Sequence, residues 1–349
     1  MRGFGMRDVD DIGWLDVPRP VCGPLDAVVR PTIVAPCTSD VRVAHGGAAP
    51  RTNRVLGHEA VGIVEAVGDL VTGFRAGDVV AVPCVTPDWL APGVQHARTV
   101  SHDAGEQGSF KFVGHKDGVM AEAFHVNQAD ANLARIPAGV PPEAALMATD
   151  MMPTGLHGAE VAEVGFGDTV VVVGIGPVGL MAVAGAVLRG AGRVIAVGGR
   201  PACLKLAAEY GASAVVSRRD DDWAGQVIRL APEVDKVIVA GGDQSTLAAA
   251  VRLVRAGGIV ANINFYDQAA VLQLPVVDWG LGMADKDIRG SFCLGGGVQL
   301  QRLLAMIAAG RIDPTRLITH TFEGLDRLPD AFALMEAKPD DLIKPIVYL

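Results

Sequence analysis

The stretch Thr169-Val170-Val171-Val172-Val173-Gly174-Ile175-Gly176-Pro177-Val178-Gly179 decides the fold of this chain. Its first five residues are β-branched, which favours a buried strand, and its glycines have the spacing Gly-x-Gly-x-x-Gly at the start of an apolar, Ala-rich segment. A strand, a glycine turn and a helix in this order can hold a pyrophosphate, because glycine lets the backbone approach it and the helix N-terminus attracts its charge. The stretch therefore predicts a dinucleotide site on a parallel sheet.

Residues 170–188 of the same region carry no charge, and an uncharged run of this length is close to the lower limit for a membrane-spanning helix. Glycines and a proline interrupt the middle of the run, which a continuous helix tolerates poorly. A strand, a turn and a helix buried in a parallel sheet explain the run better. We therefore expect no membrane association.

After residue 154 the chain alternates between strand-like and helical segments. The strand-like runs lie at 169–173, 193–197, 214–216, 236–240, 258–263 and 287–292, and the clearest helical stretches lie at 178–189 and 201–210. This alternation predicts a doubly wound parallel sheet with right-handed crossovers.

The segment before residue 154 has a different pattern of residue types. Short β-branched runs at 27–30, 61–67 and 78–82 are separated by Gly- and Pro-rich turns, which predicts an irregular, β-barrel-like domain. Near the other end, an amphipathic helix over 298–309 precedes possible strands at 317–320 and 346–349, which could rejoin the first domain. We predict an α/β chain with three parts: a β-barrel-like domain over 1–153, a dinucleotide-binding domain over 154–292, and a returning segment over 293–349.

Composition narrows the class of protein. A chain of 349 residues with 50% hydrophobic residues can build two cores, and a formal net charge of −9 argues against a nucleic-acid partner. The 5 cysteines form no C-x-x-C pair and are odd in number, which is typical of free thiols in a reducing compartment. The first residues lack the apolar core of a signal peptide. These features predict a cytoplasmic protein.

The end of the second predicted strand indicates which dinucleotide binds. A chain selective for NAD places Asp or Glu there to hold the ribose 2′-hydroxyl, whereas this strand ends Val197-Gly198-Gly199-Arg200. A missing carboxylate removes repulsion of a 2′-phosphate, and a guanidinium can bind that phosphate through two parallel hydrogen bonds. The sequence thus predicts NADP(H). Arg218 and Arg219 are either further cations at the same edge or a solvated basic pair.

Cys37, His58 and Asp150 are a soft, a borderline and a hard ligand that together suit one zinc ion. Each residue alone is more often a buried or surface residue than a ligand. Three protein ligands without a fourth leave a coordination position open, which distinguishes catalytic from structural zinc. The set predicts a metal that acts as a Lewis acid.

Residues next to these ligands suggest a proton relay and a support for the metal. Asp40 could accept the second ring N–H of His58, which is the orienting role that metal-bound histidines need. Ser39 or Thr38 could carry the substrate proton away. Glu59 is either an occasional metal ligand or a carboxylate that supports the ligands.

Taken together, these segments resemble the medium-chain, zinc-dependent alcohol dehydrogenases, and within them the NADP-dependent secondary alcohol dehydrogenases of bacteria. The resemblance extends along the whole chain. The segments that carry it are 36–40, 56–62, 86–89, 149–152, 174–176, 278–280 and 338–339.

The resemblance implies a GroES-like β-barrel catalytic domain, a Rossmann domain, and the zinc ligands Cys37, His58 and Asp150. Together with Gly174 and Gly179 of the glycine turn, the positions expected at NADP are Ile175, Gly176, Pro177, Val178, Gly198, Gly199, Arg200, Arg218, Asn264, Phe265, Tyr266 and Lys338. The positions expected at the substrate are Cys84, Val85, Trp89, Phe110, Met283, Phe292 and Cys293. Residues 95–112 contain no cysteine, so no structural zinc is expected. The resemblance also implies a homotetramer.

The chain departs from its close relatives at a few of these positions. Gly199 stands where they have Ser, and Arg218 where they have Tyr, so phosphate binding should depend more on arginine. Arg42 replaces a His of the outer proton relay. Phe110 replaces Trp and Phe292 replaces Leu, so the substrate size preference of the family does not transfer.

These observations predict the reversible oxidation of secondary alcohols to ketones with NADP⁺, with Ser39 removing the hydroxyl proton. Small uncharged alcohols with one short arm are the expected substrates. Two alternatives share the fold: a zinc-free NADPH-dependent quinone or enone reductase, and a non-catalytic NADPH-binding protein. The intact set of Cys37, His58 and Asp150 argues against the first alternative.

Overall fold

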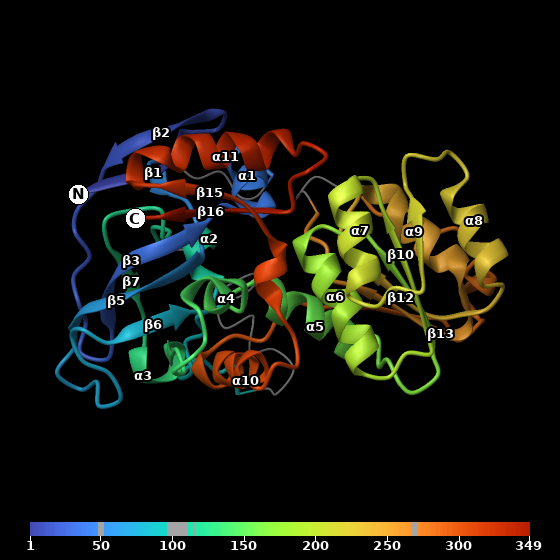
Figure 1. Ribbon diagram of the computed structural model, residues 1–349, viewed down its shortest axis with the longest axis horizontal. Coiled ribbons are helices and arrows are strands. Elements are labelled where there is room, and N and C mark those ends of the chain that lie inside the picture. Colours follow the sequence, from blue (N-terminus) through green and yellow to red (C-terminus); the bar gives the residue numbers. More distant parts are fainter. Residues whose placement is uncertain (48–51, 96–109, 115, 267–270) are drawn as a thin grey trace. The chain divides into compact units, whose positions relative to one another are not determined.

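The computed structural model describes residues 1–47, 52–95, 110–114, 116–266 and 271–349 (Figure 1). The chain divides into two compact units. Unit 1 comprises Met1–Asp150, Leu294–Lys338 and Lys344–Leu349, and unit 2 comprises Met151–Cys293 and Pro339–Ile343. The predicted boundaries at 153 and 292 fall next to these divisions. The sequence does not predict the return of Pro339–Ile343 to unit 2.

Unit 2 contains a parallel sheet with the strand order β11-β10-β9-β12-β13-β14. Every ladder of this sheet is parallel, which confirms the predicted doubly wound architecture. The strands are β9 (Thr169–Val173), β10 (Arg193–Gly198), β11 (Ala214–Ser217), β12 (Val234–Val239), β13 (Val254–Asn262) and β14 (Asp287–Gly290). The predicted strand 287–292 is too long, because its neighbour β13 ends at Asn262, which pairs with Gly290.

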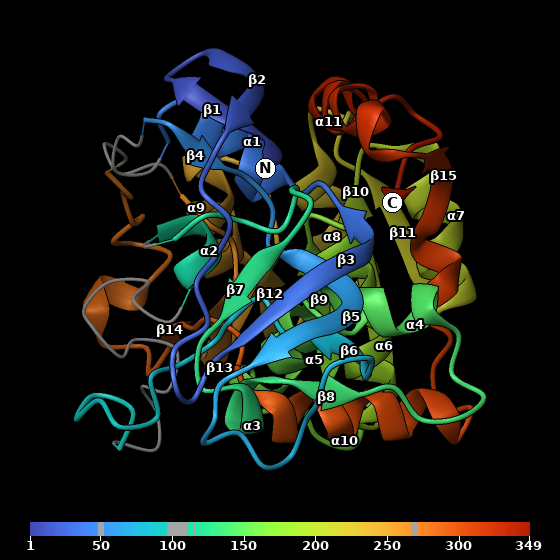
Figure 2. The same cartoon turned by 90° about the vertical axis from the view of Figure 1, so that its left-hand side faces the viewer.

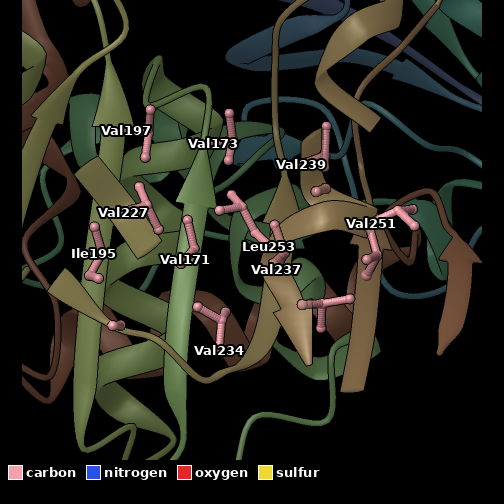
Figure 3. Close-up of a cluster of buried hydrophobic side chains, with 14 of the residues drawn as sticks. Val171, Val173, Ile195, Val197, Val227, Val234, Val237, Val239, Val251 and Leu253 are labelled. Carbon is pink, nitrogen blue, oxygen red and sulfur yellow. The ribbon is translucent and has the colours of Figure 1, made fainter. Parts of the chain in front are cut away.

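A β-branched core holds this sheet together. Figure 3 shows Val171 and Val173 of β9 beside Val237 and Val239 of β12, and all four are fully buried. The helices of unit 2 are α5 (Met151–Val161), α6 (Pro177–Leu188), α7 (Pro201–Glu209), α8 (Trp223–Leu230) and α9 (Gln244–Leu253), with the short 3₁₀ helix η1 (Gly280–Gly282). Helix α5 packs closely on α6 because Gly155 has no side chain: a Cβ there would lie 2.4 Å from Met181 Cβ.

The uncharged run 170–188 is divided between β9 and α6, as the glycine turn predicts. Among the helices that the structure describes, none combines the length and the hydropathy needed to cross a bilayer.

Unit 1 is built on a larger, mostly antiparallel sheet with the order β15-β16-β3-β5-β6-β8, and β7 also pairs with β3. Figure 2 shows β3, β5 and β6 side by side. The strands are β3 (Ala27–Ala35), β5 (Glu59–Val67), β6 (Val79–Val82), β7 (Phe124–Val126), β8 (Ala134–Arg135), β15 (Ile318–Glu323) and β16 (Lys344–Tyr348). The predicted return of the late strands to the first domain is confirmed, because β16 pairs with both β15 and β3 (Figure 1).

Short helices surround this sheet. They are α1 (Thr38–Ala44), α2 (Lys111–Gly114), α3 (Ala129–Asn132), α4 (Pro142–Met147), α10 (Gly297–Ala308) and α11 (Leu328–Ala337), with the 3₁₀ helices η2 (Pro314–Leu317) and η3 (Leu325–Arg327). Helix α10 confirms the predicted helix over 298–309 within one residue at each end.

A second, three-stranded sheet in unit 1 has no counterpart in the sequence prediction. It has the order β2-β1-β4, from β1 (Arg2–Asp8), β2 (Asp11–Asp16) and β4 (Arg54–Val55). Glycines interrupt the alternating pattern of side chains in these strands, so the sequence does not show that pattern. Gly5 is required there, because a Cβ would lie 2.0 Å from the carbonyl oxygen of Arg54.

Candidate active site

Four potential metal ligands converge in unit 1. Cys37 follows β3 and caps the N-terminus of α1, His58 and Glu59 lie at the start of β5, and Asp150 follows α4. One donor atom from each of Cys37, His58, Glu59 and Asp150 lies within 4.8 Å of the others. The structure thus brings together the three ligands predicted from the sequence, and Glu59, predicted as an occasional ligand, lies with them.

Asp40 orients this cluster. Its carboxylate accepts the backbone N–H of Cys37 at 2.8 Å and that of Gly57 at 3.1 Å, and it lies 3.1 Å from Nδ1 of His58. The ring nitrogen Nδ1 is therefore engaged, which leaves Nε2 directed to the other ligands. This contact agrees with the orienting role predicted for Asp40 from its closeness to Cys37 in sequence. Gly57 has φ +97, and a Cβ there would lie 2.7 Å from Met120 Cγ, so only glycine fits.

Asp150 lies at the centre of the donor atoms. Its Oδ2 is 3.3 Å from His58 Nε2 and 3.8 Å from Cys37 Sγ, while its Oδ1 accepts the thiol of Cys84 at 3.3 Å. Ser39 Oγ lies 3.4 Å from His58 Nε2. The predicted proton carrier is thus at the edge of the cluster, and the neighbouring Thr38 begins α1.

A buried lysine lies behind the cluster. Nζ of Lys344 donates to Glu59 Oε1 at 2.5 Å and to the Pro36 carbonyl at 3.0 Å, and both Lys344 and Glu59 are fully buried. Glu59 Oε1 is also 3.7 Å from His58 Nε2. The other oxygen, Oε2, has no hydrogen-bond partner among the residues that the structure describes. Sequence reasoning missed Lys344, which lies in a strand far along the chain and is not part of any ligand motif.

The cluster has the electrostatics of a cation site. Burial raises the pKa of Glu59 to about 7, although the charge of Lys344 opposes that change. Burial disfavours the charged form of His58, but the Asp40 carboxylate and a hydrogen bond to Asp150 raise its pKa well above the ordinary value. The cluster brings a thiol, an imidazole nitrogen and two carboxylates together in buried surroundings. One buried oxygen, Oε2 of Glu59, has no hydrogen-bond partner among the residues that the structure describes. This donor set fits a zinc ion.

Two of the substrate residues expected in unit 1, Phe110 and Cys84, contact the cluster, and Val85 and Trp89 follow Cys84 in sequence. Phe110 is buried and meets the ring of His58 edge-on, with 4.9 Å between centroids. Cys84 contacts Asp150, as described above. Val85 is buried against Gly295, where a Cβ would lie 2.3 Å from the Val85 carbonyl oxygen. Trp89 donates its ring N–H to Asn132 at 3.0 Å. The other expected pocket residues, Met283, Phe292 and Cys293, belong to unit 2, where Met283 is exposed and Cys293 is buried.

The glycine turn of unit 2 has the geometry of a nucleotide-binding corner. Gly174 has φ +92 and faces the backbone of Gly241, and a Cβ at Gly179 would lie 2.2 Å from the Gly174 carbonyl oxygen. Glycine is therefore required at both positions. Gly176 caps the twelve-residue helix α6 and Pro177 begins it, so free backbone N–H groups point out of the turn. Ile175 is buried and packs against Gly198.

Arginines flank this corner. A Cβ at Gly176 would lie 3.4 Å from the guanidinium of Arg200, which donates to the Leu342 carbonyl at 2.7 Å. Arg218 donates to Thr246 Oγ1 at 2.7 Å, and Arg219 forms an ion pair with Asp340.

The remaining positions expected at NADP lie apart from the glycine turn in sequence. Asn264, Phe265 and Tyr266 follow the end of β13. Lys338 ends α11 in the left-handed conformation and belongs to unit 1.

Comparison with known proteins identifies the class. Residues 23–138 match the family model described as alcohol dehydrogenase GroES-like domain, and residues 177–309 match that described as zinc-binding dehydrogenase. The fold and the donor cluster thus define a zinc-binding dehydrogenase.

Individual relatives narrow that class. Over the full length of both chains, this sequence is 49% identical to the NADP-dependent isopropanol dehydrogenase of Thermoanaerobacter brockii and 48% identical to that of Clostridium beijerinckii. The solved structure of alcohol dehydrogenase TADH from Thermus sp. ATN1 matches with a TM-score of 0.85 at 28% identity, covering 100% of this chain and 99% of that one. The chain belongs to the zinc-dependent medium-chain alcohol dehydrogenase family, as its motifs predict.

Proposed function

We propose that this protein catalyses the reversible oxidation of small secondary alcohols to ketones with NADP⁺ and one zinc ion. The observation that carries the proposal is the buried set of Cys37, His58, Glu59 and Asp150, whose donor atoms lie within 4.8 Å of one another. Full-length identity of 47–49% to three proteins named NADP-dependent isopropanol dehydrogenase supports the substrate and the cofactor. A zinc-free reductase would have no need for this donor set.

Cys37, His58 and Asp150 would hold the zinc, with Glu59 as an occasional further ligand. When bound, zinc supplies Lewis acidity that lowers the pKa of the alcohol, and NADP⁺ supplies the hydride acceptor. Ser39 is positioned at the edge of the cluster, 3.4 Å from His58 Nε2, to take the hydroxyl proton. Asp40 does not reach the substrate and acts by holding the ring of His58. Thr38 is the alternative proton carrier, and Arg42 leaves the outer relay different from that of the relatives.

The substrate class follows from the side chains near the cluster. Phe110, Cys84 and Val85 are buried and weakly polar or apolar, so substrate binding there depends on apolar contact. The positively charged side chain of Lys344 lies at this cluster, but it is fully buried and paired with Glu59. A carboxylate or sugar phosphate would find no available counter-charge in these residues, which favours uncharged substrates.

We further propose a cytoplasmic homotetramer with one catalytic zinc ion per chain and no structural zinc. An apolar surface around η1 supports assembly: Val277 is 81% exposed, Met283 77% and Leu281 64%, and large exposed apolar patches favour burial by a partner. The free cysteines support a reducing compartment. The segment expected to lack a structural zinc lies largely outside the described residues, at 96–109.

The proposal is tested on the purified full chain. Zinc is measured per chain, and kcat/KM is measured for 2-butanol, ethanol, sorbitol and lactate, each with NADP⁺ and with NAD⁺. We expect one zinc per chain, a preference for 2-butanol, and a preference for NADP⁺. A preference for the polyol or the acid would overturn the substrate class, and activity that survives complete removal of zinc would overturn the role of the metal. Light scattering of the same sample tests the tetramer.

A further inference from the structure

The corner expected to bind the 2′-phosphate carries Gly199, which has no side chain, and two consecutive arginines, Arg218 and Arg219, follow the next strand. We propose that Arg219, and not Arg218, binds the 2′-phosphate of NADP(H) together with Arg200. This inference rests on the proposed function and names a residue that determines its cofactor specificity.

The side chain of Arg219 lies over the space that Gly199 leaves open. A Cβ at Gly199 would lie 3.6 Å from Nε of Arg219 and 3.7 Å from its Cγ. Because residue 199 has no side chain of its own, the guanidinium of Arg219 supplies the hydrogen-bond donor nearest to this space.

Asp340 fixes the direction of Arg219. Its two carboxylate oxygens accept from Nη1 and Nη2 of Arg219, so the far end of the guanidinium is engaged. Nε also carries an N–H, which has no acceptor among the residues that the structure describes, and Nε lies near the space above Gly199. A charge-assisted donor directed in this way suits a phosphate oxygen.

The segment Pro339–Ile343 brings Arg200 and Arg219 to the same corner. Within this segment Asp340 holds Arg219, and the Leu342 carbonyl accepts from Arg200 at 2.7 Å. The segment is attached to α7 through the N–H of Ala202, which donates to the Asp340 carbonyl at 3.3 Å. The hydrogen bond from Arg219 lowers the pKa of Asp340, and the charge of Arg200 adds to this effect. The same short segment thus holds both guanidinium groups, and a phosphate carrying nearly two charges is best bound by more than one cation.

Arg218 is directed away from this corner. Its Nη2 donates to Thr246 Oγ1 at 2.7 Å and lies 3.4 Å from Asp243, both at the N-terminus of α9. A Cβ at Gly242 would lie 2.2 Å from Arg218 Nη1. Arg218 thus lies along the 242–246 segment, where it can contact the rest of the nucleotide but is not aimed at Gly199.

Two nucleotide fragments isolate the 2′-phosphate from the metal and the nicotinamide. Binding of adenosine 2′,5′-bisphosphate and of 5′-AMP to the zinc-loaded full chain is measured by calorimetry, and the ratio of the two affinities gives the contribution of the 2′-phosphate. We expect Arg219→Ala to lower this ratio by about tenfold, and by no less than about threefold. Arg218→Ala should change both affinities equally, and so leave the ratio within about twofold of the wild type.

Arg229→Ala is the matched control, because Arg229 is an exposed arginine of unit 2 that, like Arg219, pairs with an exposed aspartate, here Asp222. It should leave the ratio unchanged. A ratio that falls less than threefold in Arg219→Ala, or that falls further in Arg218→Ala, would overturn the inference while NADP specificity stands. If the wild type itself binds the two fragments equally, the proposed NADP specificity fails instead.

Discussion

At the scale of single residues, the pair of Glu59 and Lys344 is the most constrained part of the site, because both charges are fully buried. Such a pair contributes little net stability, but loss of one partner leaves an uncompensated buried charge. We expect Lys344→Met to lower the free energy of unfolding by about 3–5 kcal/mol. Urea denaturation in the presence of a chelator measures this loss.

A second substitution separates the charge from the packing. Because Gln carries no charge, the double variant Lys344→Met with Glu59→Gln should recover at least half of the loss. If the double variant is as unstable as the single one, lost packing of the lysine chain is the cause, and the buried charge is not.

Asp150 carries a prediction about the metal. An amide is a poor zinc ligand, so Asp150→Asn should lower the zinc content and reduce kcat by more than about a hundredfold. Binding of NADPH, followed by fluorescence, should persist because the glycine turn belongs to unit 2. Asp69→Asn, at an exposed position, makes the same charge change and should leave both properties unaltered. Full activity of a zinc-depleted Asp150→Asn protein would contradict the assignment.

The sequence predicts the donor residues better than it predicts their surroundings. Cys37, His58 and Asp150 are recognisable because their residue types and neighbours match a ligand set. Asp40 is close to Cys37 in sequence, which suggests its contact with His58. Lys344 offers no such signal: it lies 308 positions after Pro36, to which it donates, and it is the first residue of the short strand β16. Only the pairing of β16 with β3 brings it to Glu59.

At the scale of elements, His45 joins three segments of unit 1. It ends α1, its Nδ1 lies 2.5 Å from Asp10 in the turn between β1 and β2, and its Nε2 bonds to Glu336 of α11. The hydrogen bond to Asp10, followed by that to Glu336, raises the pKa of His45. Two ring N–H donors exist only in the protonated imidazole, so this junction is complete only in the charged form.

A raised pKa in the folded state gives a definite pH dependence. The stabilisation is fully present below the unfolded pKa of about 6.5 and is lost as the pH rises through the higher folded value. His45→Asn should therefore destabilise the protein more at about pH 5.5 than at about pH 9, by less than about 1 kcal/mol because the pair is exposed to solvent. Urea denaturation at both pH values measures the difference. A loss that does not vary with pH would mean that the contacts do not depend on protonation.

Among the elements, the central strands β9 and β10 of unit 2 were predictable because they are rich in β-branched residues and buried on both faces. The strands β1 and β2 were not, because glycines at Gly3, Gly5 and Gly13 replace the side chains that would show an alternating pattern. Gly5 is required because the backbone of β4 approaches it closely. This contact between strands leaves no pattern in the neighbouring sequence, so the sequence alone does not reveal it.

At the scale of the whole molecule, β16 is an internal strand of unit 1, between β15 and β3. Ile346 is fully buried, whereas Thr321, its register partner on β15, is exposed. Ile346→Asp should lower the free energy of unfolding by more than about 3 kcal/mol, because it buries an unpaired charge. Thr321→Asp introduces the same charge on the neighbouring strand β15 and should lower the free energy of unfolding by less than about 1 kcal/mol. Equal effects in urea denaturation would contradict the internal position of β16.

The position of β16 also sets an order of events on the ribosome. Unit 2 is translated after β3 and before β16, and nascent chains fold domain by domain as they emerge. We expect unit 2 to fold while β3 still presents an open edge and Glu59 still lacks its lysine. An unpaired apolar strand edge invites association with other chains, so this interval is when the protein depends most on chaperones. Nascent chains from which residues 1–343 have emerged, but not β16, should accordingly resist protease in unit 2 and be cleaved in unit 1; equal protection of both units would show that unit 1 folds without β16.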